Sequence, residues 1–110
     1  MPNVGERRSE RVLLDIPVVL FGETADRGPF REETFTVTVS AHGALLMLET
    51  KVAIGQKVKL ANPGNWDERE ARVAFVGGDH AGLAAVGIEF DQPSPQFWPV
   101  TTPPANWKAC

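Results

Sequence analysis

Three arginines near the start of the chain are the first residues whose types and spacing could do chemistry together. Arg7, Arg8 and Arg11 lie within five positions, in the stretch "RRSER". A guanidinium group stays charged and can donate two parallel hydrogen bonds to an anionic group. The cluster therefore predicts a local anion site on a chain whose net charge is −3. A solvated basic tail is the other interpretation of the same spacing.

A second candidate surface lies in "ETFTVTVSAHGALLML", residues 33–48, where polar and apolar residues alternate until Ser-Ala-His-Gly interrupts them. Successive side chains of a strand point to opposite faces. One face is predicted to join the core through Phe35, Val37 and Val39. The opposite face carries four small hydroxyl residues, Thr34, Thr36, Thr38 and Ser40. Such a face is either a solvated sheet surface or a place where a polar group docks.

Residue types that commonly carry catalysis are sparse. The only histidines, His42 and His80, fall in expected turns, where an exposed turn histidine is the simplest interpretation. Ser40 lies two residues from His42, but a nucleophile and its base also need an orienting group and an oxyanion site, which the sequence does not supply. Asp79 and His80 would need metal-binding partners from elsewhere in the chain. We therefore expect no enzyme activity, no metal site and no cofactor.

The composition is that of an ordinary globular chain. Its 110 residues, 43% of them hydrophobic, suffice for one domain with one core. The slight acidic excess argues against a binder of nucleic-acid polymers or anionic membranes. No apolar run approaches the ~20 residues of a membrane span, and the polar N-terminus does not resemble a secretory signal, so we expect a cytoplasmic protein without membrane insertion. Cys110 is the only cysteine, which excludes an internal disulfide.

Six stretches have the alternation and the flanking turn residues of strands. In the first of them Pro17 faces away from the apolar side, which indicates a strand edge because proline has no backbone donor. Residues 22–32 have the composition of a loop. The expected strands are 12–21, 33–40, 43–49, 56–63, 66–78 and 83–91. The expected fold class is all-β, a small antiparallel barrel or sandwich of six strands.

The C-terminal residues are rich in proline and tryptophan. Proline excludes strand pairing and a long helix here, leaving at most one helical turn around Pro95 to Trp98. Because a free tail would rarely keep Trp98 and Trp107, we expect both rings to pack on the barrel. The chain is thus expected to comprise a flexible N-terminal arm (1–11), a barrel (12–95) and a packed C-terminal segment (96–110).

The two polar groups of residues, in this order and followed by "VGIEF" at 86–90, resemble the PilZ domain, a bacterial receptor module for cyclic di-GMP. The family pattern is Arg-x-x-x-Arg, matched by Arg7 and Arg11, then Asp or Asn-x-Ser-x-x-Gly at the end of an early strand, matched by Ser40 and Gly43. Residues 96–107, "QFWPVTTPPANW", are similar to the tail of single-domain members. The resemblance covers nearly the whole chain and implies a six-stranded antiparallel split barrel.

The resemblance implies a ligand site formed by Arg7, Arg8, Arg11, Thr38, Ser40 and Gly43. Cyclic di-GMP presents two phosphates and two guanines, and guanidinium groups can bind phosphate oxygens or guanine O6 and N7. In the family the arginines lie on an N-terminal arm that wraps over the ligand, so the signal is expected to pass through rearrangement of that arm to an unknown downstream protein. The chain departs from the family at Thr38, where the planar side chain of Asp or Asn is usual.

Two other functions follow from the same residues. A PilZ-fold adaptor that has lost nucleotide binding and acts through protein contacts is favoured by Thr38, whereas the retained Arg7, Arg11, Ser40 and Gly43 argue against it. A single-strand nucleic-acid binder would need a basic groove interleaved with exposed aromatic residues. The acidic excess and the absence of tyrosine argue against such a groove.

Overall fold

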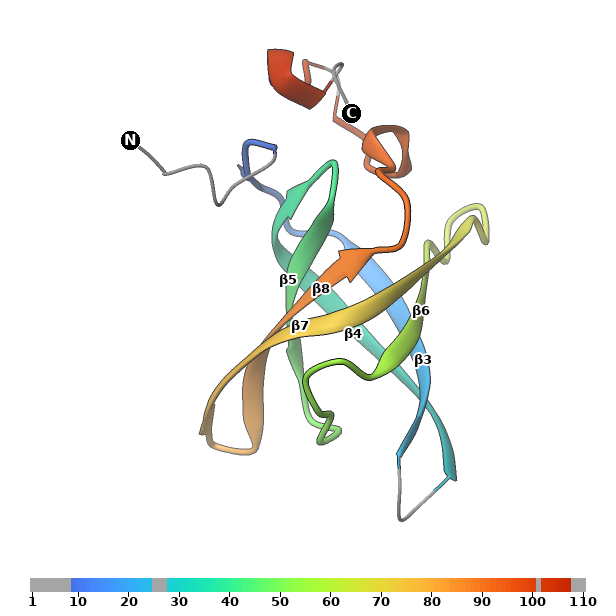
Figure 1. Ribbon diagram of the computed structural model, residues 1–110, viewed down its shortest axis with the longest axis vertical. Coiled ribbons are helices and arrows are strands. Elements are labelled where there is room, and N and C mark those ends of the chain that lie inside the picture. The colour runs from blue at the N-terminus through green and yellow to red at the C-terminus, as the bar shows by residue number, and fades with distance from the viewer. Residues whose placement is uncertain (1–8, 25–27, 101, 108–110) are drawn as a thin grey trace.

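Seven antiparallel strands form one sheet in the part of the chain that the computed structural model describes, residues 9–24, 28–100 and 102–107. Pairing runs in the order β2-β4-β3-β6-β7-β8-β5, and a further pairing between β4 and β5 closes the sheet. Six strands thus form a barrel, while β2 pairs with β4 as an extra strand (Figure 1). The expected all-β, six-stranded antiparallel barrel is confirmed. The strands are β2 (Val12–Leu13), β3 (Pro17–Thr24), β4 (Gly28–Ser40), β5 (Gly43–Leu48), β6 (Lys57–Ala61), β7 (Glu68–His80) and β8 (Leu83–Phe90).

Strand boundaries differ from the expectation by up to two residues in β6 and β7, and by more in two places near the start of the chain. The first expected strand is interrupted after Leu13 and resumes at Pro17. Because β3 pairs with β6 only from Val19 onward, Pro17 lies at an edge of the sheet, as expected. The segment 22–32 is not a loop, because β3 and β4 continue through it and pair as far as Thr24 and Gly28. Beyond Gly22 the described part of this arm pairs with no third strand. Phe30, opposite Gly22, packs against the core, but the described residues beyond this pair are Glu, Thr, Gly and Pro, which conceals the strand pattern.

A β-bulge in β4 reverses the expected faces of residues 34–37. Thr36 pairs with Leu46, and the next pair is Thr38 with Leu45, so Val37 is an extra residue. Before the bulge, Thr36 is 2% exposed while Phe35 is 58% exposed. The Thr36 hydroxyl donates to Leu14 O at 2.5 Å and accepts from Ile16 N at 3.2 Å.

These bonds explain how a hydroxyl side chain is tolerated in the interior of the barrel. After the bulge the expected faces are restored, because Val39 is buried while Thr38 and Ser40 reach the surface. The hydroxyl face therefore survives only at the end of β4. The expectation that Phe35 and Val37 join the core is wrong, since the phase of the strand changes between them and Val39.

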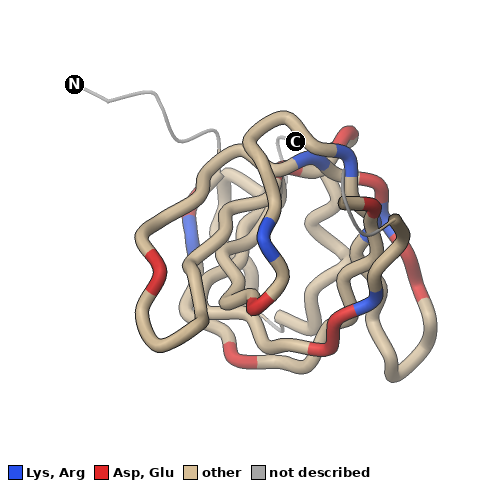
Figure 2. The backbone as a smooth tube through the Cα atoms, turned by 90° about the horizontal axis from the view of Figure 1, so that it is seen from below, with Lys and Arg blue, Asp and Glu red and all other residues tan. Residues whose placement is uncertain are grey.

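The barrel interior is filled by aliphatic side chains, and the aromatic residues of the C-terminal segment extend this core at one end. Phe97, Trp98 and Trp107 are 4%, 3% and 1% exposed and belong to the same cluster as the aliphatic residues. The Phe97 and Trp98 rings meet edge to face, with centroids 4.9 Å apart. Seen from below, the strands close into a ring with charged residues spread around it (Figure 2). Apart from its alanines, the aliphatic members are Val18, Leu20, Val39, Leu46, Leu48, Val58, Leu60, Val73, Val86 and Ile88.

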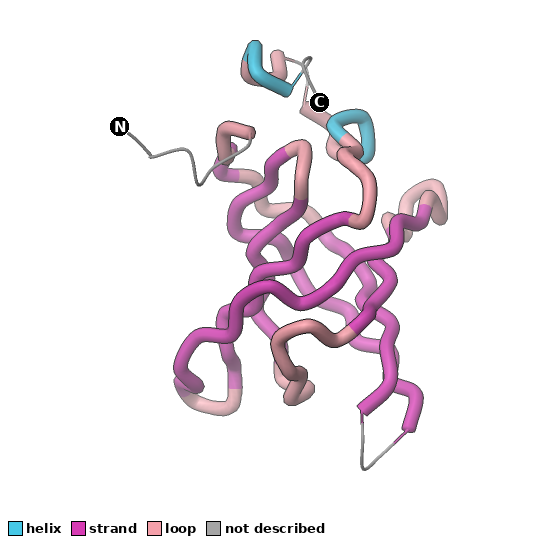
Figure 3. Tube along the Cα trace, viewed as in Figure 1, coloured by secondary structure: helices cyan, strands magenta, loops and turns pink. Residues whose placement is uncertain are grey.

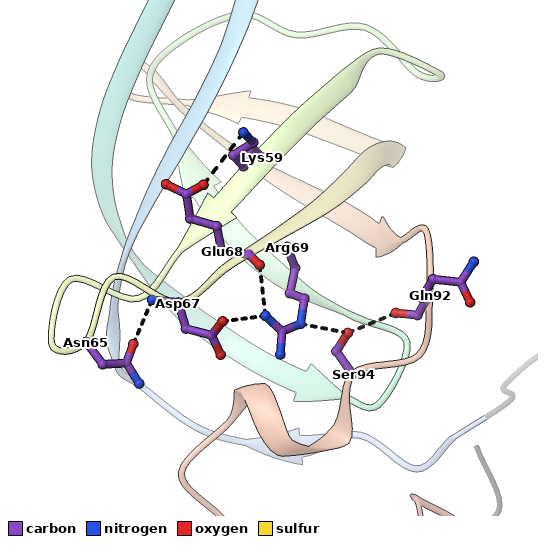
Figure 4. A network of polar contacts seen from close by, with 7 residues as sticks. All are labelled: Lys59, Asn65, Asp67, Glu68, Arg69, Gln92 and Ser94. Carbon is purple, nitrogen blue, oxygen red and sulfur yellow. Dashed lines mark hydrogen bonds and ion pairs between the residues drawn. The ribbon is translucent and has the colours of Figure 1, made fainter.

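Polar contacts around Arg69 fasten the chain that follows β8 to the barrel (Figure 4). Arg69 Nε donates to Ser94 Oγ at 3.2 Å, and the guanidinium also pairs with Asp67. The same guanidinium lies 5.4 Å from the centre of the Phe97 ring. Ser94 N in turn donates to Ala41 O at 2.7 Å. The start of the C-terminal segment is thereby held against the turn between β4 and β5.

Two short 3-10 helices follow, η1 (Pro95–Phe97) and η2 (Ala105–Trp107). The first is the helical turn expected between Pro95 and Trp98, and the second has no counterpart in the sequence-based expectation. Both lie at the end of the barrel where the described chain begins and toward which the β4–β5 turn points (Figure 1; Figure 3). Three segments that are distant in sequence therefore meet at one end of the molecule.

Candidate ligand-binding site

A hollow of about 560 Å³ is lined by the start of the described chain, by the β4–β5 hairpin and by residues of β7 and β8, and it contains every predicted site residue that the structure describes. Arg11 contributes from the N-terminal side, Thr38 and Ser40 from the end of β4, and Gly43 from the start of β5. Arg7 and Arg8 lie outside the described residues. We call this hollow the ligand pocket. Its lining is completed by Ser9, Val39, His42, Ala44, Leu45, Ala74, Phe75, Gly87, Ile88 and Glu89.

Strand β2 places Arg11 beside the end of β4. Val12 pairs with Val39 and Leu13 with Thr38, and the same register continued by one residue brings Arg11 level with Ser40. Arg11 is exposed and makes no ion pair or hydrogen bond with the described residues. Its guanidinium is therefore available to an anion that enters the pocket.

The two hydroxyl residues of the pocket keep hydrogen-bonding capacity. Thr38 is half-buried, and its hydroxyl has no hydrogen-bond partner among the described residues. Ser40 Oγ accepts a hydrogen bond from His42 N at 3.2 Å, and the Ser40 hydroxyl can still donate a hydrogen bond of its own. The Ser40 carbonyl oxygen accepts from Trp98 Nε1 at 2.8 Å, so the C-terminal segment fixes the backbone at this position.

Gly43 has a structural reason to lack a side chain. A Cβ atom at this position would lie 1.9 Å from the carbonyl oxygen of Ile88 on β8. Because the obstacle is backbone, no side-chain movement could relieve the clash. The close approach of β5 to β8 thus accounts for this glycine before any ligand is considered.

Residues 9–11 are held to the barrel and to the C-terminal segment. Ser9 is 2% exposed, and its Oγ lies 2.9 Å from His42 Nδ1. Glu10 N donates to Asn106 Oδ1 at 3.1 Å, and Glu10 O accepts from Trp107 Nε1 at 2.7 Å. The backbone between the arginines of "RRSER" is therefore fixed from two sides. His42, expected to be an exposed turn histidine, is instead half-buried and bonded to Ser9.

Phe75 is a pocket residue that sequence reasoning missed. Its ring is 52% exposed, and the residue pairs with Gly87 of β8, where an added Cβ would come within 3.2 Å of Phe75 Cβ. An exposed aromatic face can stack on a purine. The only signal in the sequence is a glycine in "VGIEF", whose partner across the sheet cannot be known before the register is known.

Asp79 and His80 lie at the opposite end of β7 from Glu68, away from the ligand pocket. Asp79 Oδ2 pairs with Lys51 Nζ at 2.9 Å, and Asp79 Oδ1 accepts from Gly82 N at 2.9 Å. The hydrogen bond from Lys51, and then that from Gly82, lower the pKa of Asp79 below its usual value. The carboxylate is thus used to hold the β7–β8 turn. Within the described residues no three groups of metal-binding type cluster, and no helix is long and apolar enough to span a membrane.

Comparisons with known proteins agree with this geometry. The family model of the PilZ domain matches residues 6–97. The structure of the inhibitor of motility MotI/DgrA from Bacillus subtilis is similar over 81% of this chain and 44% of that one, with a TM-score of 0.59 and 17% identity. The PilZ domain with c-di-GMP of YcgR from Escherichia coli is similar over 84% of this chain and 82% of that one, with a TM-score of 0.55 and 18% identity.

These identities are low, so the two solved structures show a shared fold and no more. The chain spans less than half of the length of the B. subtilis protein. No curated protein sequence matches it. The family model, in contrast, covers both motif regions and all the strands of the barrel. The chain therefore belongs to the PilZ domain family, a family of receptor modules for cyclic di-GMP.

Proposed function

We propose that this chain is a non-catalytic receptor that binds cyclic di-GMP in the ligand pocket. One observation carries the proposal: two motif regions far apart in sequence line the same hollow, and Arg11 in it has no partner among the described residues. An unpaired guanidinium beside hydroxyl groups suits a ligand with phosphates and hydrogen-bonding bases. Such a receptor for an intracellular messenger would act in the cytoplasm.

The pocket residues have complementary roles in this proposal. Arg11 donates two hydrogen bonds to a phosphate or to guanine O6 and N7. A guanine base stacks on the exposed ring of Phe75. Ser40 donates its hydroxyl proton to an acceptor on the ligand. Arg7 and Arg8, which lie outside the described residues, are expected to complete the arginine clamp.

Thr38 weakens binding in this proposal without preventing it. A hydroxyl can replace one contact of the planar pair that Asp or Asn makes with a guanine edge, but not both. The loss of one such pair corresponds to about 1–3 kcal/mol, which is roughly fivefold to 150-fold in affinity. The other contacts of the pocket do not depend on this position.

Residues 9–11 are the proposed route of the signal. Arg11 would move toward the ligand, and Glu10, next to it, is bonded to Asn106 and Trp107 of the C-terminal segment. Ligand binding would therefore change the contacts between the start of the chain and that segment. A downstream protein would then read the new arrangement.

An adaptor that has lost nucleotide binding is the second candidate. It is favoured by Thr38 and also by Gly43, because the contact of Gly43 with Ile88 explains this glycine without a ligand. The two candidates differ in one measurable property, the binding of the nucleotide.

Calorimetric titration with cyclic di-GMP separates the candidates. We expect saturable binding by the wild type, a loss of at least about tenfold in Arg11→Ala, corresponding to 1.4 kcal/mol, and unchanged binding in Arg31→Ala. Arg31 is the matched control because it is exposed, pairs with Glu33 and does not line the pocket. Binding that is absent in the folded wild type would leave the adaptor as the better account.

A further inference from the structure

An exposed apolar surface lies beside the ligand pocket on the same strands. Leu13, Phe35, Val37 and Leu83 are 81%, 58%, 38% and 38% exposed, and with Met47 they line a second hollow of about 650 Å³. We call this group the apolar patch. The two hollows share no lining residue. Single exposed apolar residues are common, but a group around one hollow is typical of an interaction site.

The bulge in β4 creates this patch. Inward positions of a barrel strand normally hold the apolar residues of an alternating pattern. In β4 the inward position before the bulge holds Thr36, whose hydroxyl needs two backbone partners there, while Phe35 and Val37 face outward. Hydrophobic burial alone would favour the opposite phase. A role at the surface gives a reason for this arrangement.

The charged side chains that line the second hollow are all acidic. They are Asp15, Glu32, Glu33 and Glu49, and no Lys or Arg among the described residues lines it. Glu33 is paired with Arg31, whereas Asp15 and Glu49 make no ion pair with any described residue. This rim repels anionic lipids and nucleic acids and attracts cations. A second copy of the chain would bring an identical acidic rim to a symmetric interface, which disfavours self-association.

We propose that the apolar patch docks a basic amphipathic helix of a partner protein. Apolar side chains along one face of such a helix would fill the hollow, and lysines or arginines beside them would pair with Asp15 and Glu49. Strand addition is less suitable because β2, the edge strand here, has only two residues, Val12 and Leu13. The partner is therefore defined by a helix with an apolar face flanked by positive charge.

The position of the patch allows the ligand to control docking. Leu13 of the patch pairs with Thr38 of the ligand pocket and lies two residues after Arg11. A movement of Arg11 toward a nucleotide would displace Leu13. This control rests on the proposed function, whereas docking itself requires no nucleotide and can be tested in its absence.

A designed peptide tests the docking. The probe is a labelled peptide of about 15 residues with leucine on one helical face and lysine on the other, a length at which an isolated helix becomes marginally stable. Binding is followed by fluorescence anisotropy with the full chain and no nucleotide. The comparison peptides are a Leu/Glu version with the same pattern and a scrambled Leu/Lys version without an apolar face.

Variants of the chain locate the binding surface. We expect the Leu/Lys peptide to bind best, and Phe35→Ser and Leu13→Ser each to weaken it by at least about tenfold, or 1.4 kcal/mol. Both side chains are exposed, so each variant should keep its circular dichroism spectrum and melting temperature. Ile54→Ser is the matched control, because Ile54 is 69% exposed and lines neither hollow. Asp15→Lys with Glu49→Lys should reverse the preference toward the Leu/Glu peptide.

Several outcomes would overturn the proposal. These are no binding of the Leu/Lys peptide, equal loss in Ile54→Ser, or equal binding of the scrambled peptide. Sedimentation of the wild type as a dimer that Phe35→Ser dissociates would assign the patch to a second copy of the chain. Co-flotation with neutral lipid vesicles that Phe35→Ser abolishes would assign it to a lipid surface. None of these measurements involves cyclic di-GMP, so they do not depend on whether the chain binds it.

Discussion

Replacing Trp107 by phenylalanine tests how strongly the C-terminal segment holds the arginine motif. Trp107 is 1% exposed, and its Nε1 donates to Glu10 O at 2.7 Å. Phenylalanine keeps most of the apolar ring and removes the donor. The change therefore isolates the hydrogen bond better than Trp107→Ala, for which about 3–5 kcal/mol is expected from loss of the ring.

The expected cost of Trp107→Phe is about 1–3 kcal/mol, the usual penalty for leaving a partly buried acceptor without its donor. For a domain of this size each kcal/mol lowers the melting temperature by roughly 4–8 °C. The change is measured by urea unfolding followed by circular dichroism. Tryptophan fluorescence is not used, because each substitution removes one of the tryptophans that would give the signal. Trp66→Phe is the control, since Trp66 is 54% exposed and should change stability by less than about 0.5 kcal/mol.

The same variant should weaken cyclic di-GMP binding, because Glu10 lies beside Arg11 and loses one of its two fixed contacts. If Trp107→Phe unfolds at the same urea concentration as Trp66→Phe, the reasoning about the Trp107–Glu10 hydrogen bond is refuted. A destabilised Trp107→Phe with wild-type affinity would show instead that the bond serves the fold and not the ligand pocket.

Three further predictions follow from the geometry. Thr38→Asn should strengthen cyclic di-GMP binding by an amount on the order of 1–3 kcal/mol in calorimetric titration, and the gain should disappear in the Arg11→Ala background because contacts to one ligand are coupled. Gly43→Ala should unfold at a much lower urea concentration than the wild type, by more than about 3 kcal/mol, since its Cβ would overlap the Ile88 carbonyl oxygen. The pKa of Asp79 is lowered in the folded state, so the carboxylate contributes stability above its usual pKa of 3.8 and loses this contribution as the pH falls toward the lowered value. Asp79→Asn should therefore flatten the acid side of a curve of unfolding free energy against pH.

The bounds of β8 and β5 were predicted best. In both strands buried residues alternate with half-buried ones, and the observed bounds, Leu83–Phe90 and Gly43–Leu48, fall within one residue of the expected ones. The arm of β3 and β4 beyond Gly22 has no buried face and therefore no such pattern. The bulge at Val37 was also beyond sequence reasoning, because a regular alternation fits either phase and the choice depends on pairing with β5.

The ligand pocket was predictable where its residues belong to a local motif. Arg11, Thr38, Ser40 and Gly43 were selected from two short stretches, and the barrel brings them together. The contacts that hold them are not local. Ser9 and His42 are 33 positions apart, Trp98 and Ser40 are 58 apart, and Trp107 and Glu10 are 97 apart. Only the closed barrel determines such pairs, so the sequence indicated buried tryptophans without indicating their partners.

The bulge in β4 gives one strand two different surfaces. Beyond Val37 the strand presents Thr38 and Ser40 to the ligand pocket, and before it the strand presents Phe35 to the apolar patch. Strand β2 crosses between these surfaces, with Arg11 before it and Leu13 within it, and it has only two paired residues of its own. The barrel strands have longer ladders and closed pairing, so they resist displacement more strongly. A signal from the ligand pocket to the apolar patch would therefore pass through β2, and its strength would be set by the bonds of Ser9 and Glu10 that fix the start of this strand.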